Sequence, residues 1–101
     1  DFVFVPDDDP RERNSYHTFV VQVDRREELI AHLTSCGIGT AIHYPIPIHL
    51  QPAAKFLGFG EGSFPVTESQ AKRIITLPIN QHLTEHEIQT VSQTINSFYE
   101  R

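Results

Sequence analysis

A proline-rich run in the middle of the chain, residues 43–52, constrains the backbone more than any other part of the sequence. It reads His-Tyr-Pro-Ile-Pro-Ile-His-Leu-Gln-Pro. Each proline fixes φ and has no amide hydrogen to donate, and each favours an extended conformation in the residue before it. The run therefore suits neither a helix interior nor a central strand. We predict a rigid loop that displays two histidines and a tyrosine, and loops of this kind often carry binding residues.

Three short strands are predicted from alternating apolar and β-branched residues. They span residues 16–23, 38–42 and 75–79. In the first of them, alternate apolar residues share one face, which is typical of a strand that is buried on that side. The second ends immediately before His43 and therefore delivers that histidine to the start of the proline-rich loop.

Three helices are predicted from capping boxes. In this motif a Thr or Asp side chain accepts a hydrogen bond from the amide three residues later, where a Glu or Gln side chain reaches back. Gly37 provides a left-handed end for the first helix. The last helix also carries an apolar stripe that should pack on a core. The capping pairs are Asp24 with Glu27, Thr67 with Gln70, and Thr84 with Glu87, and the stripe is Ile88, Val91, Ile95 and Phe98.

The order of these elements predicts an α+β fold with two layers, in which a short three-stranded sheet is flanked by helices. Residues 2–5 read as a short strand or extended segment, and a charged stretch with prolines follows, so we assign residues 1–15 to a linker. Residues 16–101 form the predicted domain, which is large enough for one hydrophobic core. Cys36, at the end of the first helix, should be a small core residue.

Charge and composition exclude several classes of partner. The chain has 13 acidic and 8 basic residues and a net charge of -5, so it offers no basic stripe for a nucleic acid. The single cysteine cannot form a disulfide within the chain, and no apolar stretch resembles a signal peptide or a membrane span. We therefore expect a cytoplasmic protein that binds neither nucleic acid nor membrane.

A possible zinc motif occurs at residues 82–86, which read His-Leu-Thr-Glu-His. The pattern H-x-x-E-H needs both histidines on one face of a continuous helix. The predicted cap at Thr84 places His82 outside the helix, so the two imidazoles are not one turn apart. We expect no metal site here, only two solvated histidines.

Several short blocks of sequence follow one another from about Tyr16 to Tyr99. They are Tyr16-His17-Thr18-Phe19-Val20-Val21, Arg26-Glu27-Glu28-Leu29, Gly37-Ile38-Gly39-Thr40, the His-Tyr-Pro loop, Phe56-Leu57-Gly58-Phe59, Phe64-Pro65-Val66, Thr76-Leu77-Pro78-Ile79 and Leu83-Thr84-Glu85. This ordered set resembles the DegT/DnrJ/StrS family of pyridoxal-phosphate-dependent sugar aminotransferases. The resemblance implies the fold of the small C-terminal domain of fold-type I aminotransferases.

The resemblance implies a function that this chain supplies only in part. In that family a lysine of a large N-terminal domain holds pyridoxal phosphate, and neither Lys55 nor Lys72 matches its sequence setting. We therefore expect a C-terminal fragment of a longer enzyme, a homodimer that transfers an amino group, with glutamate as the donor, to a keto group of a nucleotide-linked sugar. The fragment alone should bind no pyridoxal phosphate and should be inactive.

The resemblance also implies that the proline-rich loop lies over the active site, near the sugar. Four residues are then candidates for substrate binding: His43, Tyr44, His49 and His17. A neutral imidazole can both donate and accept, which suits a sugar hydroxyl, and tyrosine offers an apolar face with a polar tip. The alternatives are that His43 only closes a strand, that Tyr44 packs in the core, and that His17 is satisfied at a strand edge. No catalytic residue is expected in this chain.

A second hypothesis of a different class stays open at this point. The chain would then be a free-standing α+β module that binds a small ligand or a partner without catalysis. One fold hosts many functions, so the predicted fold does not decide between the two hypotheses. The coding sequence upstream of this chain distinguishes them, because only the enzyme needs a large domain with the cofactor lysine.

Overall fold

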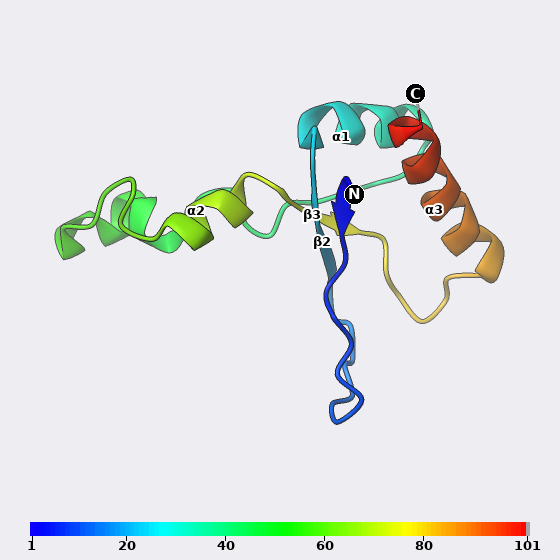
Figure 1. Ribbon diagram of the computed structural model, residues 1–101, viewed down its shortest axis with the longest axis horizontal. Coiled ribbons are helices and arrows are strands. Elements are labelled where there is room, and N and C mark those ends of the chain that lie inside the picture. The colour runs from blue at the N-terminus through cyan, green and yellow to red at the C-terminus, as the bar shows by residue number, and fades with distance from the viewer. Residues whose placement is uncertain (101) are drawn as a thin grey trace.

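The protein is described here by a computed structural model in which residues 1–100 are placed. Its elements form an α+β fold, as predicted, with one antiparallel sheet and three α-helices (Figure 1). The strands are β1 (Val3–Phe4), β2 (Phe19–Val23) and β3 (Ile74–Leu77), in the spatial order β1-β2-β3. The helices are α1 (Arg26–Ser35), α2 (Pro65–Ala71) and α3 (Glu85–Tyr99), with the 3₁₀ turns η1 (Ile48–Leu50) and η2 (Pro52–Leu57).

The membership of the sheet differs from the prediction. Residues 38–42 do not form a strand, and only Ala41 forms an isolated bridge with Thr76. A glycine weakens strand pairing, and the proline-rich run follows within a few residues, so the pairing ends after one bridge. The third strand is instead β1, within the segment assigned to the linker, where Val3 pairs with Val23. β3 ends before Pro78, which has no amide hydrogen for the ladder.

The hydrophobic core lies between the sheet and the helices α1 and α3. Val21 and Ile75 are direct partners in neighbouring strands, and both are fully buried. Two residues of the predicted stripe on α3 are buried against them, as expected, but Ile88 is 55% exposed. Ile88 borders an open apolar hollow between α3 and the sheet, together with Phe19 and Leu77. The core residues are Val21, Val23, Leu29, Leu33, Ile38, Ile75, Ile95 and Phe98.

The capping-box prediction is confirmed at α3 and wrong at α1 and α2. At α3 the prediction is confirmed, because Thr84 accepts from the Glu87 amide and the Glu87 carboxylate accepts from the Thr84 amide. At α1 it is wrong. Arg25 occupies the N-cap with φ of 55°, and the carboxylate of Asp24 accepts from Arg73 instead, at 2.9 Å. The Asp24 carboxylate thus binds the distant Arg73 and not the nearby amide of Glu27.

The start of α2 also differs from the prediction. The helix begins at Pro65, two residues before Thr67, and no side chain caps it. Proline suits the first helical position because its fixed φ is helical and the missing amide hydrogen would have no partner there. The Glu68 carboxylate takes the place of the predicted capping pair, because it accepts hydrogen bonds from the amides of Gly62 and Phe64.

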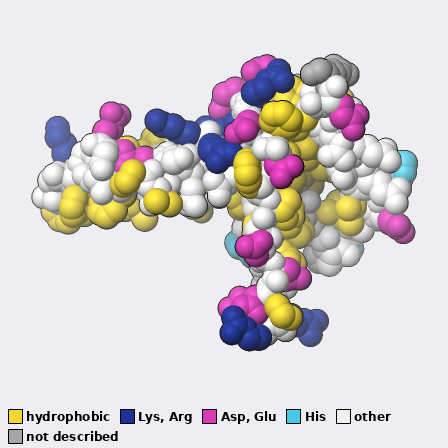
Figure 2. All heavy atoms as spheres, viewed as in Figure 1, with side chains coloured by type: hydrophobic (Ala, Val, Ile, Leu, Met, Phe, Trp, Pro, Cys, Tyr) yellow, Lys and Arg dark blue, Asp and Glu magenta, His cyan; other side chains and the backbone are white. Residues whose placement is uncertain are grey.

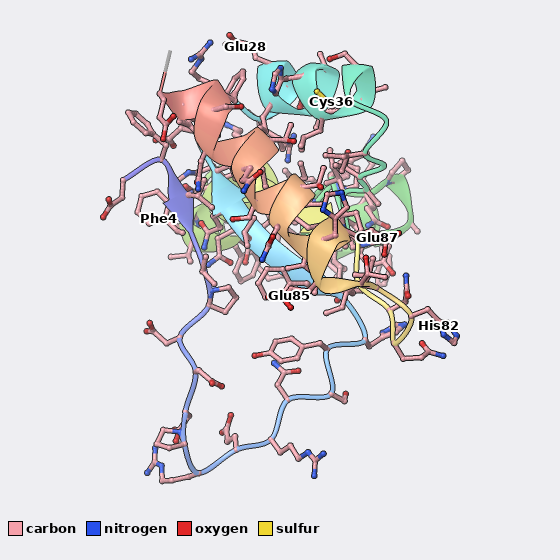
Figure 3. All side chains as sticks on the ribbon, turned by 90° about the vertical axis from the view of Figure 1, so that its right-hand side faces the viewer. Phe4, Glu28, Cys36, His82, Glu85 and Glu87 are labelled. Atoms are coloured by element: carbon pink, nitrogen blue, oxygen red, sulfur yellow. The ribbon has the colours of Figure 1, made fainter. Side chains whose placement is uncertain are left out.

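The predicted end of α1 at Gly37 is confirmed. Gly37 has φ of 76°, and its amide donates to the Thr34 carbonyl. The amide of Ile38 donates to the Leu33 carbonyl, and both of these side chains are buried, so the end is a Schellman motif with its hydrophobic contact. Cys36 is exposed at this turn, which corrects the prediction of a core residue (Figure 3).

Residues 44–72, here called the arm, extend away from the core (Figure 1). The guanidinium of Arg26 holds the C-terminal end of the arm and the start of β3 to α1, because it donates to the carbonyls of Ala71 and Ile74 at 2.7 and 3.2 Å. Figure 2 shows apolar side chains along one side of this projection. The large apolar residues exposed on the arm are Tyr44, Ile46, Ile48, Phe56, Leu57, Phe59, Phe64 and Val66. Within residues 1–100, no helix is long and apolar enough to cross a membrane.

Candidate functional site

The site is built around His43, where the chain leaves the sheet and enters the arm. Thr76 and Ala41 exchange both backbone hydrogen bonds, at 2.7 and 3.2 Å, and this bridge fixes the backbone two residues before His43. The imidazole Nδ1 lies 2.8 Å from the hydroxyl of Thr76. The backbone of Ala41 and the side chain of His43 are thus both attached to Thr76 of β3. The rest of the exposed His43 ring, including Nε2, is available to a ligand.

Tyr44 follows across a cis peptide bond and presents its ring beside that of His43. The two rings meet edge to face, with centroids 5.4 Å apart. Tyr44 is 71% exposed, so it does not pack in the core of this chain. Its ring borders a shallow hollow together with residues 45, 46 and 51–53, and the Gln51 amide closes this loop by donating to the Ile46 carbonyl at 3.1 Å.

His49 is separated from His43 and lies inside the arm, where only 7% of its surface is exposed. Its Nε2 is 3.3 Å from a Glu68 oxygen, but the two groups are not aligned as a hydrogen bond. Its ring also meets the edge of Phe64, with centroids 4.8 Å apart. In this chain His49 therefore packs the arm together and does not present its ring to the surface.

Glu68 is a charged residue of the arm that the sequence did not single out. Its oxygens accept from the amides of Gly62 and Phe64 at 2.7 and 2.9 Å. The hydrogen bond from Gly62, with further help from Phe64, keeps the pKa of this carboxyl below its ordinary value, against the opposing effect of burial. The carboxylate thereby ties the turn before α2 to the helix itself.

His17 stands apart from the other candidates. It is exposed in a bend just before β2, and within residues 1–100 it makes no side-chain hydrogen bond. Its neighbour Tyr16 instead packs on Phe19, with ring centroids 5.8 Å apart. The structure therefore brings together His43 and Tyr44, and it places His49 and His17 elsewhere.

The two histidines of residues 82–86 lie on either side of Thr84, the N-cap of α3. His82 lies before α3, where its amide donates to the Asn80 side chain, while His86 is on the first turn of the helix (Figure 3). This is the separation that the predicted cap implies. Across residues 1–100, no group of three His, Cys, Asp or Glu side chains is placed to hold a metal ion.

Comparison with known proteins decides the family. The sequence matches the model of the DegT/DnrJ/EryC1/StrS aminotransferase family over residues 2–96. The chain belongs to this family. A Streptococcus pneumoniae protein solved in a PLP form also matches, with a TM-score of 0.82 and 25% identity over 97% of this chain and 26% of that one.

Relatives from this family match almost the whole chain. The dTDP-3-amino-3,4,6-trideoxy-alpha-D-glucose transaminase of Streptomyces venezuelae is 40% identical over 99 residues, which cover 98% of this chain and 25% of that protein. EryC1 of Saccharopolyspora erythraea is 40% identical over 95 residues, 94% of this chain and 26% of that protein. The crystal structure of S. venezuelae DesV in complex with a ketimine intermediate matches with a TM-score of 0.93 and 37% identity, over 100% of this chain and 27% of that one. The chain spans about a quarter of the length of these relatives.

The cofactor of the family does not fit the lysines of this chain. Lys55 lies on η2 and Lys72 at the end of α2, and both are exposed. A residue that holds a bound cofactor usually lines a pocket that encloses most of it. Neither lysine side chain is enclosed in this way within the described residues.

Proposed function

We propose that this chain is the small C-terminal domain of a pyridoxal-phosphate-dependent aminotransferase that acts on a keto group of a nucleotide-linked sugar, with glutamate as the amino donor. Membership of the family and the transaminase name of the S. venezuelae relative support this assignment. The observation that carries it is the likeness of the whole chain to a structure solved with a ketimine intermediate. Residues 16–101 are assigned to the small domain, and residues 1–15 lead into it and contribute β1 to its sheet.

The cofactor is assigned to the part of the enzyme outside this chain. The exposed positions of Lys55 and Lys72 support this assignment. The role of the present residues is to bind and orient the substrate and to exclude water around it, which is what the protein contributes in cofactor enzymes. The chain alone is therefore expected to be inactive.

His43 and Tyr44 are the residues assigned to the sugar. They are adjacent, exposed, and held at the root of the arm by the bridge to β3. An imidazole with one nitrogen engaged by the protein has the other free for a polar ligand, and the tyrosine ring can lie against the apolar face of a sugar ring. His49 and His17 remain weaker candidates, because one is buried in the arm and the other lies apart.

The exposed apolar side of the arm also supports the assignment to a larger enzyme. A monomeric soluble protein rarely leaves a large contiguous apolar surface uncovered. The remaining three quarters of the enzyme, or its second subunit in a homodimer, would cover this side. A free-standing module would leave the same side chains in water.

The decisive experiment measures each half-reaction of the intact enzyme in a single turnover. His43→Ala should slow the half-reaction with the keto sugar more than the half-reaction with the amino donor. A lost hydrogen bond to an uncharged group weakens the transition state by about 0.5 to 1.5 kcal/mol, or up to about 10-fold in rate. Tyr44→Phe keeps the ring and removes the hydroxyl, so it tests that polar contact separately.

The matched control is His82→Ala, which removes an exposed histidine from the loop before α3. It should leave both half-reactions unchanged. Equal slowing of both half-reactions by His43→Ala would assign this residue to the cofactor or to packing. Unchanged rates in both would contradict the proposed sugar contact.

A further inference from the structure

The partner of His43 is itself an unusual residue of the sheet. Thr76 is a polar residue in β3 with only 8% of its surface exposed. Its neighbours Ile75 and Leu77 pack with the core, and strand residues alternate in direction. The Thr76 side chain therefore points to the opposite face of the sheet, and Ala41 pairs with Thr76 along the edge of β3. Burying a hydroxyl is favourable only when it has a hydrogen-bond partner.

The single side-chain partner of this hydroxyl, among residues 1–100, is the Nδ1 of His43 at 2.8 Å. Two arrangements of protons are possible at this contact. If Nδ1 carried the proton and donated it, the hydroxyl proton of Thr76 would be left buried without an acceptor. If the hydroxyl donates to an unprotonated Nδ1, both polar groups are satisfied. The second arrangement avoids an unmade hydrogen bond at a buried site.

We propose that Thr76 is a positioning residue that donates its hydroxyl hydrogen to Nδ1 of His43 and so fixes the imidazole with its proton on Nε2. The backbone bridge between Thr76 and Ala41 sets where the histidine stands, and the hydroxyl sets which nitrogen carries the proton. In a neutral imidazole the protonation of one nitrogen is decided by the hydrogen bond that the other makes.

The tautomer decides what kind of ligand atom His43 can recognise. With its proton on Nε2, the neutral ring offers a hydrogen-bond donor to the ligand and no acceptor. The matching ligand atom is a hydrogen-bond acceptor, such as a keto, hydroxyl or phosphate oxygen. The identification of that ligand as a nucleotide-linked sugar rests on the proposed function, but the direction of the Thr76 hydrogen bond does not.

The proposal is tested without substrate, by ¹⁵N NMR of the histidine side chains in the full 101-residue chain. Two-bond couplings between ring nitrogens and carbon-bound protons should show neutral His43 with a protonated Nε2 and a hydrogen-bonded Nδ1. Thr76→Val keeps the β-branched shape and removes the hydroxyl, so the Nδ1 signal should move to the position of a free acceptor. Thr76→Ser restores the hydroxyl and should restore the wild-type signal.

The control is Thr67→Val, which removes an exposed threonine hydroxyl from α2 and should leave the His43 signals unchanged. A neutral His43 ring with its proton on Nδ1 in the wild-type chain would overturn the proposal. So would identical His43 signals in the wild type and Thr76→Val.

The intact enzyme gives a second readout. Thr76→Val should lower kcat/KM for the keto sugar by up to about 10-fold, with Thr76→Ser close to the wild type. If the NMR result holds and this kinetic effect is absent, the positioning by Thr76 stands and the proposed sugar contact of His43 fails.

Discussion

The core and the arm of this protein are ordered by different forces. In the core, α1 and α3 bury apolar side chains against β2 and β3, and Leu29, Leu33 and Ile75 have no exposed surface. The arm exposes most of its large apolar residues, and Phe56 is 84% exposed. Its conformation rests instead on four prolines, two 3₁₀ turns and the hydrogen bonds of Glu68. Burial of apolar side chains within the chain explains the structure of the core but not the conformation of the arm.

Because of this contrast, the exposed apolar residues of the arm and the buried apolar residues of the core should have different roles. Buried side chains such as those of α3 stabilise the chain in which they lie. Exposed aromatic side chains contribute little to the stability of their own chain, and clustered ones mark interaction surfaces. We therefore expect substitutions in the core to change the stability of this chain, and substitutions on the arm to change its association with the rest of the proposed enzyme.

The largest effect should come from Phe98→Ala in the core. Phe98 lies among the buried residues of α3, and truncating a buried phenylalanine typically costs about 3 to 5 kcal/mol. A domain of this size has about 5 to 15 kcal/mol of stability in all, so the melting temperature should fall steeply. Thermal unfolding followed by circular dichroism measures the change. An unaltered melting curve would mean that α3 does not pack on the sheet.

An effect confined to the arm should appear on acidification. The pKa of Glu68 is lowered in the folded chain below its ordinary value of 4.5, so its stabilising contribution is fully present above that value. It is lost as the pH falls through the folded pKa. Below pH 4.5 the protection factors of the Gly62 and Phe64 amides should therefore decrease, while core amides keep theirs.

Two variants sharpen this pH test. Glu68→Gln cannot titrate, so it should abolish the acid-dependent change at the two amides. Glu61→Gln removes an exposed glutamate from the same turn and should preserve the change. NMR hydrogen exchange at several pH values measures both. If Glu68→Gln retained the pH dependence, another group would control this turn.

The smallest effect on stability should come from Phe56→Ser on the arm. The side chain is almost fully exposed, and surface substitutions usually change stability by about 0.5 kcal/mol or less. The melting temperature of the chain should stay the same, and its tendency to aggregate should fall. A loss of stability comparable to that of Phe98→Ala would show that Phe56 packs within this chain, and the distinction between core and arm would fail.

Local sequence signals predicted helix ends that depend on nearby residues better than contacts between distant residues. The α3 cap and the Gly37 stop depend on residues a few positions apart, and both were predicted correctly. The cap of α1 was wrong because Arg73, 49 positions away, binds the carboxylate of Asp24. The strand predicted at residues 38–42 was wrong for a similar reason, because strand pairing depends on the whole sheet.

The candidate site could be predicted only in part for the same reason. The prolines indicated the loop and therefore His43 and Tyr44, but the role of Thr76 depends on a contact across 33 positions. A polar residue between two apolar residues of a buried strand was the only signal for it. His49 and Glu68 meet inside the arm because of the turn at residues 58–63, whose path the sequence does not specify.

Hydrogen exchange in the isolated chain and in the intact enzyme tests the account most directly. Amides of β2, β3 and α3 should be similarly protected in both, because the core is complete within this chain. Amides of the arm, especially around Phe56 and Phe64, should be weakly protected in the isolated chain and strongly protected in the intact enzyme. Equal protection of the arm in the two samples would contradict the account, because the arm would then be ordered by this chain alone.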